Sequence, residues 1–439
     1  MRTKRTRRHR LRRLIAPTAG LYRYVAVAVA GIIVFLFGAT IIFRVLVEPF
    51  TADVTAGWES FLTGLGFGEQ VDTATHVFGL VMVLAGMYLV YRGVRTFDRR
   101  MAEAVDPSSR NGVMDAYARK QQLTRGPRIV AIGGGTGLST LLRGLKQHTS
   151  NITAIVTVTD DGGSSGGIVT EMGIMPPGDI RNCLVALADA EKRMTDLFQH
   201  RFKKSSGMFS GHSVGNLLIA GFYEQTGDVD AALQMASDVL AIRGRVLPST
   251  RTHVRLKALM ADDEEICGET AIVESASAVR RVYLEPPDAE PHPDALGAIA
   301  AADMVCIGPG SVFTSIIPNL IVPGIAEAIQ KSGALKVYIC NVMTQPGESD
   351  AFTAAEHMVA IEANVDGRVC DYVLVNALSP TPATMQRYNE YGQDLVEPDL
   401  ERLRHMGYLP VSRDLMSDTD YVRHDPARLA NALIDLLYR

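Results

Sequence analysis

The segment RIVAIGGGTGLSTLLRGLK, residues 128–146, constrains the fold of this 439-residue chain more than any other segment. Its first five residues are mostly apolar and β-branched, which is typical of a buried strand. Four glycines follow, at Gly133, Gly134, Gly135 and Gly137. After them, leucines recur at the 3, 4 and 7 spacing of an amphipathic helix, at Leu138, Leu141, Leu142 and Leu145. A strand, a glycine turn and a helix in this order predict an α/β fold with a mostly parallel sheet.

The glycine turn, with Thr136 inside it, has two interpretations. It presents backbone N–H groups and the positive end of a helix, which together suit an anion such as a phosphate. It is not a P-loop, because no Gly-Lys-Ser/Thr follows, and it fails G-x-G-x-x-G because position 138 is leucine. Taken alone, the segment leaves phosphate binding and a plain tight turn both open.

A second apolar strand runs into TVTDDGGSSGG, residues 157–167. An acid at the carboxyl end of the strand beside the glycine turn lies where a nucleotide ribose binds. Paired carboxylates beside phosphate-binding backbone also suit Mg²⁺, and a solvated turn is the third interpretation. The candidate ligand residues here are Asp160, Asp161, Gly162, Gly163, Ser164 and Ser165, with Asp160 and Asp161 as the candidate metal ligands and the only candidates for catalysis.

Later loops add further candidates. PPGDIRN places Asp179 at a helix start, where its carboxylate caps the helix or binds a ligand, and GHSVGN places His212, Ser213 and Asn216 around another. Two more buried strands end in polar loops that supply the remaining candidates, Gly308, Gly310, Ser311 (at a predicted N-cap) and Asn341. Four such loops beside core elements favour a nucleotide-type site.

Other segments fill in the body of the fold. Residues 245–284 contain two alternating runs around the acidic turn at residues 262–265, which predicts an inserted β-hairpin. The end of the chain predicts an amphipathic helix with Pro426 in its first turn. Five scattered cysteines in apolar surroundings predict reduced core thiols rather than disulfides or zinc.

Before this body, the sequence predicts a transmembrane helical hairpin at residues 24–91. Residues 24–43 are 20 positions without a charge, and residues 74–91 form a second apolar span interrupted only by His76. The loop at residues 44–73 carries one arginine and five acids, whereas both flanks are basic. The positive-inside rule therefore predicts a two-pass protein of the inner or plasma membrane, with both termini and the main domain in the cytoplasm.

The charge is divided unevenly along the chain. Residues 1–23 form a basic tail, with eight Lys and Arg in the first 13 positions, while the other 36 Lys and Arg face 48 Asp and Glu. Anionic lipid headgroups explain such a tail without nucleic acid. Residues 92–126 predict a juxtamembrane linker, and residues 127–439 the ligand-binding domain. Small residues in the first span, Gly31 and Gly38, would allow hairpins to pair into a homo-oligomer.

Seven ordered motifs within residues 127–437 resemble the YvcK-like gluconeogenesis factor family. They are GGGTGLSTLLRGLK, AIVTVTDDGGSSG, PPGDIRN, LFQHRF, GHSVGNLL, GPGSVFTSIIPNL and KVYICNVMTQPGE. That family is a branch of the CofD-like superfamily, named for 2-phospho-L-lactate transferase. This sequence departs from the family after Gly166, where Gly167 to Thr170 stand in place of a basic stretch.

The resemblance implies a Rossmann-like core with helices on both faces of the sheet and a nucleotide or UDP-sugar ligand. It also implies a regulatory role in cell shape, the cell envelope and carbon metabolism. A Mg²⁺-dependent transferase of a phospho-acyl or nucleotidyl group is the alternative, in which Asp160 and Asp161 hold the metal. An NAD-dependent oxidoreductase is disfavoured because the dinucleotide fingerprint fails.

Overall fold

The computed structural model describes residues 56–57, 60–61, 63–64, 66, 113–189, 192–203, 207–417 and 422–439. The chain divides into two compact units, residues 1–122 and 123–439, and the helix α3 (Val113–Thr124) spans their boundary. The predicted membrane helices at residues 24–43 and 74–91 lie outside the described residues. Among the residues that are described, no single helix is long and apolar enough to cross a membrane. One pair of helical segments joined by a bend, Val312–Leu320 and Ile325–Lys331, has the length and the apolar composition of a membrane span, and nothing beyond these two properties indicates one.

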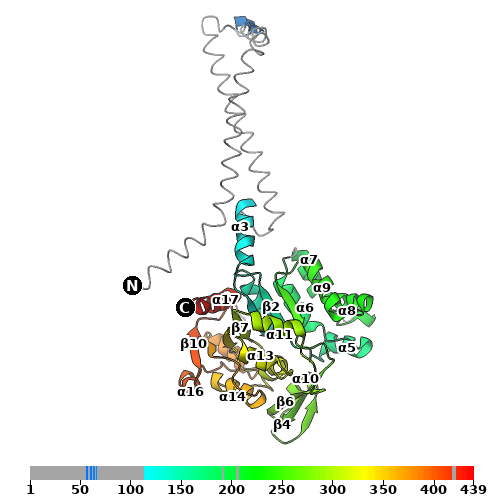
Figure 1. The fold of residues 1–439 in the computed structure, drawn as a ribbon, viewed down its shortest axis with the longest axis vertical. Helices are drawn as coiled ribbons and strands as arrows, with labels where there is room; N and C mark the ends of the chain where they lie inside the picture. The colour runs from blue at the N-terminus through cyan, green and yellow to red at the C-terminus, as the bar shows by residue number, and fades with distance from the viewer. Residues whose placement is uncertain are drawn as a thin grey trace. The chain divides into compact units, whose positions relative to one another are not determined.

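The core of the second unit is a seven-stranded sheet in the order β10-β9-β8-β7-β1-β2-β3, and all neighbours in it are parallel. Ile132 of β1 pairs with Ile155 of β2 on one side and with Ile307 of β7 on the other. The predicted parallel sheet is confirmed (Figure 1). Its strands are β1 (Ile129–Gly133), β2 (Ile152–Val156), β3 (Arg245–Pro248), β7 (Met304–Ile307), β8 (Leu335–Ile339), β9 (Tyr372–Asn376) and β10 (Leu409–Arg413).

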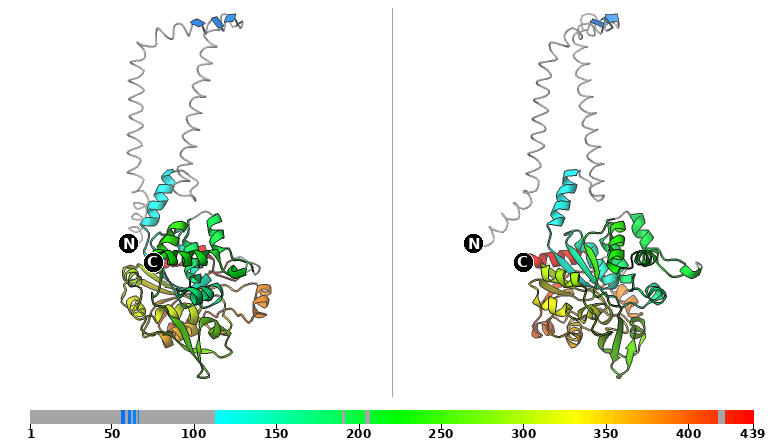
Figure 2. Two further views of the ribbon diagram at one scale, coloured as in Figure 1. Left: turned by 90° about the vertical axis from the view of Figure 1, so that its right-hand side faces the viewer. Right: turned by 45° about the vertical axis from the view of Figure 1, so that its right-hand side comes forward.

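The strand order reverses beside β1. From β1 the chain steps outward through β2 to β3, then returns to β7 and steps the other way to β10. Because crossovers between parallel strands are right-handed, the two directions place helices on opposite faces of the sheet, as Figure 2 shows. The helices α4 (Gly135–Leu145), α6 (Gly178–Leu187) and α17 (Pro426–Leu437) pack on one another, and α13 (Ile325–Lys331) and α14 (Ala354–Asn364) belong to the other direction. The point of reversal lies between β1 and β7.

The crossover from β2 to β3 is long and helical. Besides α6 it contains α5 (Gly163–Met172), α7 (Lys192–Gln199), a short 3₁₀ turn (Gly207–Phe209), α8 (Val214–Thr226) and α9 (Val229–Leu240). Ser213 caps α8, and Asp228 caps α9, through side chains that accept backbone N–H bonds. The helices α7, α8 and α9 pack on α6, α5 packs on α8, and α9 also packs on β3, so they extend the domain at that edge of the sheet.

The inserted β-hairpin is confirmed, with two corrections to its extent. β4 (Arg255–Met260) and β5 (Glu265–Cys267) pair antiparallel around the acidic turn. β6 (Val279–Glu285) adds a third strand beside β4, and α10 (Glu269–Glu274) lies between β5 and β6. The predicted start at residue 245 was wrong, because β3 pairs with β2 in the main sheet.

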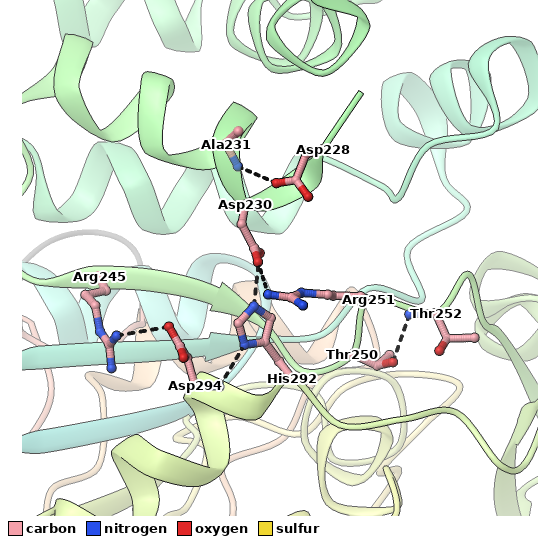
Figure 3. A network of polar contacts seen from close by, with 9 residues as sticks. All are labelled: Asp228, Asp230, Ala231, Arg245, Thr250, Arg251, Thr252, His292 and Asp294. Carbon is pink, nitrogen blue, oxygen red and sulfur yellow. Dashed lines mark hydrogen bonds and ion pairs between the residues drawn. The ribbon is translucent and has the colours of Figure 1, made fainter. Parts of the chain in front are cut away.

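Beyond the insertion, the chain re-enters the sheet through α11 (Pro293–Ala301), which begins at the buried His292. The His292 ring accepts the N–H of Asp294 on Nδ1, at 3.2 Å. The other ring nitrogen, Nε2, therefore carries the proton and donates to Asp230 at 3.0 Å (Figure 3). Arg251 forms an ion pair with the same carboxylate. Because Asp230 lies in the first turn of α9 and His292 precedes α11, the buried histidine links the starts of these two helices.

The remaining elements follow the last strands. A π-helical turn (Val312–Ile316) and α12 (Ile317–Leu320) follow β7, α15 (Pro382–Asn389) and α16 (Leu400–His405) follow β9, and α17 ends the fold with Pro426 in its first turn, as predicted. The five cysteines are free thiols, and the prediction of core residues is confirmed for the four that are buried, whereas Cys267 is half-buried.

Candidate functional site

A cavity of about 950 Å³ lies at the carboxyl ends of β1, β7 and β8. This is the point at which the strand order reverses, where ligands bind in open α/β sheets. The sequence-predicted residues that the structure brings together on its wall are Gly134, Gly135, Thr136, Gly137, Asp160, Gly310, Ser311 and Asn341.

The turn at the cavity wall is built from glycines because, at two of its positions, neighbouring atoms lie too close for a side chain. A Cβ at Gly134 would lie 2.5 Å from Asp179 Oδ2, and a Cβ at Gly137 would collide with the carbonyl oxygen of Pro309. The helix α4 begins at Gly135, so its first N–H groups, which have no partner within the helix, lie beside the cavity. Gly133 lies beneath this turn, where a Cβ would be 3.8 Å from the Cα of Gly308.

The loop after β7 forms the second wall. Asn341, at the end of β8, donates to the Gly310 carbonyl at 2.9 Å and accepts the Gly310 N–H at 3.2 Å. Ser311 occupies the N-cap position of the next helical turn, as predicted, but its hydroxyl makes no capping bond and accepts from Gln345 at 2.8 Å instead. The loop after β7 is thus fixed by side chains from the loop that follows β8.

The paired aspartates separate in the structure. Asp160 accepts the Gly162 N–H at 3.0 Å and lies on the wall of the main cavity. Asp161 accepts from both the N–H and the hydroxyl of Thr270, at 3.0 and 2.8 Å, and lines a different cavity of about 440 Å³. Asp160 lines that smaller cavity as well, so the two aspartates share it, and only Asp160 also reaches the main cavity.

Two further carboxylates do share the main cavity with Asp160. Asp179 is the second residue of α6, whose N-cap is Pro177, so capping, one of the two roles that the sequence offered for Asp179, was wrong. Burial and the charge of Asp160 raise the pKa of Asp179 to about 6. Glu269 comes from the start of α10, and burial, followed by the charges of Asp160 and Asp179, raises its pKa to about 9. Glu269 is protonated at neutral pH, and its buried Oε2 has no partner among the described residues.

The far wall was not predicted from the sequence. It comes from α15 and the loop before α17, which contribute Tyr388, Tyr391 and His424. His424 is buried, and burial lowers its pKa to about 4 while its ring bonds the backbone of Cys340. Its Nε2 is buried without a partner among the described residues, so the neutral ring offers one acceptor at the cavity. Tyr391 is 74% exposed at the rim.

The other predicted residues line a smaller pocket of about 290 Å³ that shares Asp160, Asp179 and Asn182 with the main cavity. Ser164 lies on its wall within hydrogen-bond distance of His212 Nδ1, at 3.2 Å, and of Asn216 Nδ2, at 3.0 Å. The sequence-predicted members of this pocket are Gly162, Gly163, Ser164, Ser165 and Asn216. They adjoin the main cavity rather than line it.

Across the described part of the chain, no group of three or more His, Cys, Asp or Glu residues is placed to hold a metal by protein ligands alone. The carboxylates of Asp160, Asp179 and Glu269 still supply oxygen donors on one cavity wall. Mg²⁺ in proteins commonly keeps one or two carboxylates and completes its shell with water and phosphate oxygens. This donor set fits such an ion only together with a ligand.

The fold and site define an α/β protein with a polar cavity at the reversal point of a parallel sheet. The chain belongs to the CofD family: the family model described as 2-phospho-L-lactate transferase CofD matches residues 129–416. The gluconeogenesis factor of Bacillus subtilis is 47% identical over 313 residues, which are 71% of this chain and 98% of the relative. The resemblance to the YvcK-like gluconeogenesis factors is confirmed.

Some relatives extend further toward the N-terminus. A gluconeogenesis-factor relative from Nostoc sp. is 40% identical over 423 residues, which are 96% of this chain and 91% of the relative. A crystal structure of a UPF0052 family member from Bacillus halodurans has a TM-score of 0.68 and 43% identity, covering 71% of this chain and 99% of the other. Similarity therefore includes both the α/β domain and, in the Nostoc relative, most of the segment before it.

Proposed function

We propose that this protein is a membrane-anchored regulator that binds a nucleotide-sugar of the UDP-sugar class in its main cavity. The observation that carries the proposal is the cavity of about 950 Å³ at the reversal point of the sheet, with the start of α4 on its wall. Its volume lies in the range of pockets that enclose small-molecule ligands. The N–H groups of Thr136 and Gly137 suit the diphosphate.

The rest of the wall offers partners for a nucleoside. The Asp160 carboxylate, at the end of the strand beside the glycine turn, can accept ribose hydroxyls. Tyr388 and Tyr391 offer aromatic faces for a base. The unpartnered Nε2 of His424 suits one ligand N–H group, which a uracil ring has.

A divalent cation is compatible with this proposal, but the two carboxylates that would hold it differ from the pair Asp160 and Asp161 that the sequence indicated. Asp160 and Asp179 line the same cavity, whereas Asp161 is bonded to Thr270 and lies elsewhere. Asp160 and Asp179 would hold Mg²⁺, which would supply positive charge to offset the ligand phosphates.

The alternative function is a Mg²⁺-dependent transferase similar to 2-phospho-L-lactate transferase. The observation that favours it is the convergence of Asp160, Asp179 and Glu269 on one cavity in a chain of the CofD family. Such an enzyme would act mainly by positioning its substrates and by stabilising charge on the transferred group.

Calorimetry on the full-length protein separates the two functions. We expect UDP-N-acetylglucosamine to bind, more tightly with Mg²⁺, and GDP and NAD to bind more weakly. If GDP alone binds and a phospholactyl donor is turned over in the presence of Mg²⁺, the regulator function would be rejected and the transferase function supported.

The proposed regulation concerns cell shape, the envelope and carbon metabolism, and the proposed anchor is the hairpin at residues 24–91 with its basic tail on the lipid surface. The names of the gluconeogenesis-factor relatives support the metabolic part of this proposal. A bacterium that loses this protein should grow poorly and change shape on a gluconeogenic carbon source. Normal growth and shape on such a source would contradict this role.

A further inference from the structure

The smaller pocket, of about 290 Å³, contains a buried arginine that no carboxylate pairs with. Arg181 of α6 is 8% exposed. It donates to Ser213 Oγ, to Asn216 Oδ1 at 2.9 Å and to Asn182 Oδ1 at 2.8 Å. All three acceptors are neutral, and Nε has no partner among the described residues. No carboxylate in the described part of the chain bonds this guanidinium directly, and a buried charge without a bonded counter-ion is costly, so the pocket favours an anion beside Arg181.

A second cation reinforces this preference. Arg201 lines the same pocket, and its Nη1 also donates to the Gly211 carbonyl. Neither arginine is in an ion pair among the described residues. The segment after Gly166 carries no basic residue before Glu171, so the cations beside this loop come from α6 and from the segment after α7.

The loop at residues 162–165 supplies neutral donors. Ser164 Oγ lies 3.0 Å from Asn216 Nδ2 and 3.4 Å from the Ser213 N–H, and both are donors. Its own proton must then point to His212 Nδ1, so Ser164 is fully used. Ser165 Oγ, in contrast, makes no hydrogen bond within the described residues and remains free for a ligand. The ten-residue helix α5 begins at Gly163, which adds unpaired N–H groups beside the pocket.

We propose that this pocket binds a phosphate monoester or inorganic phosphate at the same time as the main cavity binds its own ligand. Arg181, Arg201, Ser165 and the first N–H groups of α5 are its donors. The remaining charged groups that face it are Asp160 and Asp179, on the edge shared with the main cavity. They oppose the anion until a cation neutralises them, so we expect binding to strengthen with Mg²⁺. The proposal does not depend on which nucleotide the main cavity takes.

The test uses the full-length protein, titrated calorimetrically with inorganic phosphate and, separately, with glycerol phosphate. Arg201→Gln should weaken binding of both at least about tenfold, since a charge-assisted contact is lost. Arg193→Gln removes the same charge from an exposed position on α7, outside the pocket, and should change binding less than about twofold. If glycerol phosphate binds more tightly than inorganic phosphate, the natural ligand of the pocket is a phosphate monoester. If inorganic phosphate binds more tightly, the ligand is the free phosphate ion.

A competition arm separates this proposal from the proposed function. Saturating UDP-N-acetylglucosamine should leave phosphate binding in place. Loss of phosphate binding under that condition would show a single shared site and overturn the second pocket. Equal effects of Arg201→Gln and Arg193→Gln would also overturn it. Absence of nucleotide-sugar binding, with phosphate binding intact, would overturn only the proposed function.

Discussion

Asn341 and Gly310 hold each other by two reciprocal hydrogen bonds: Asn341 Nδ2 donates to the Gly310 carbonyl at 2.9 Å, and Asn341 Oδ1 accepts the Gly310 N–H at 3.2 Å. This pair fixes the loop after β7 against the end of β8. Asn341→Ala should lower the free energy of unfolding by about 1–3 kcal/mol, because backbone groups lose their partner. It should also weaken nucleotide-sugar binding at least about fivefold, measured by calorimetry.

Asn364 supplies a matched control for this prediction. It likewise accepts a backbone N–H, from Val282 at 2.8 Å, and donates to a carbonyl, that of Ala360, at 2.8 Å. It does not line the main cavity. Asn364→Ala should therefore cost similar stability without changing ligand affinity. If both variants reduced affinity equally, the Asn341 effect would be general destabilisation.

Gly137→Ala tests the close approach of the two loops. The added Cβ collides with the carbonyl of Pro309, so the loops must move apart at the cavity. We expect affinity for the nucleotide-sugar to fall at least about tenfold, with a lower melting temperature. Gly221→Ala, in α8, meets nothing within 4 Å and should leave both unchanged or raise stability by up to about 1 kcal/mol. Unchanged affinity in Gly137→Ala would contradict this account of the turn.

His424 should make the fold sensitive to acid. Burial lowers its pKa from 6.5 to about 4, so between these values the unfolded chain binds a proton that the folded one does not. Stability is therefore lost as the pH falls from about 6.5 to 4, by at most about 3 kcal/mol from this group. His357 has a lowered pKa as well and contributes with the same sign. Denaturant unfolding of His424→Gln should show a shallower pH dependence than wild type, and identical slopes would refute the assignment.

The order of elements and half of the site follow from local sequence, because strand period, glycine turns and helix starts are set by neighbouring residues. That is why Gly134 to Gly137, Asp160 and Asn341 were placed correctly at strand ends. The separation of Asp160 from Asp161 was not predictable, since it depends on Thr270, 109 residues further along the chain.

The far wall was beyond prediction for the same reason. Glu269 and His424 stand in segments that give no local sign of a ligand, and they become site residues only when α10 and the loop before α17 close on the sheet. Their unusual pKa values come from burial, which a sequence does not display. Asp179 was visible at a helix start, but its closeness to Gly134 was not.

The predicted membrane topology has a direct test in intact cells. Thr51→Cys, in the loop between the predicted spans, should react with a membrane-impermeant maleimide before lysis, because the basic flanks keep both ends of the hairpin inside. Ser108→Cys, in the linker, should react only after lysis. Labelling of Thr51→Cys only after lysis would exclude the two-pass orientation.

The adjacent pair Asp160 and Asp161 gives the most direct measurement of where the nucleotide-sugar binds. Calorimetry with UDP-N-acetylglucosamine and Mg²⁺ would compare wild type with Asp160→Asn and Asp161→Asn, two isosteric losses of one charge. Because only Asp160 lines the main cavity, Asp160→Asn should weaken binding at least about tenfold and Asp161→Asn less than about threefold. Equal losses, or a larger loss for Asp161→Asn, would contradict the site proposed here.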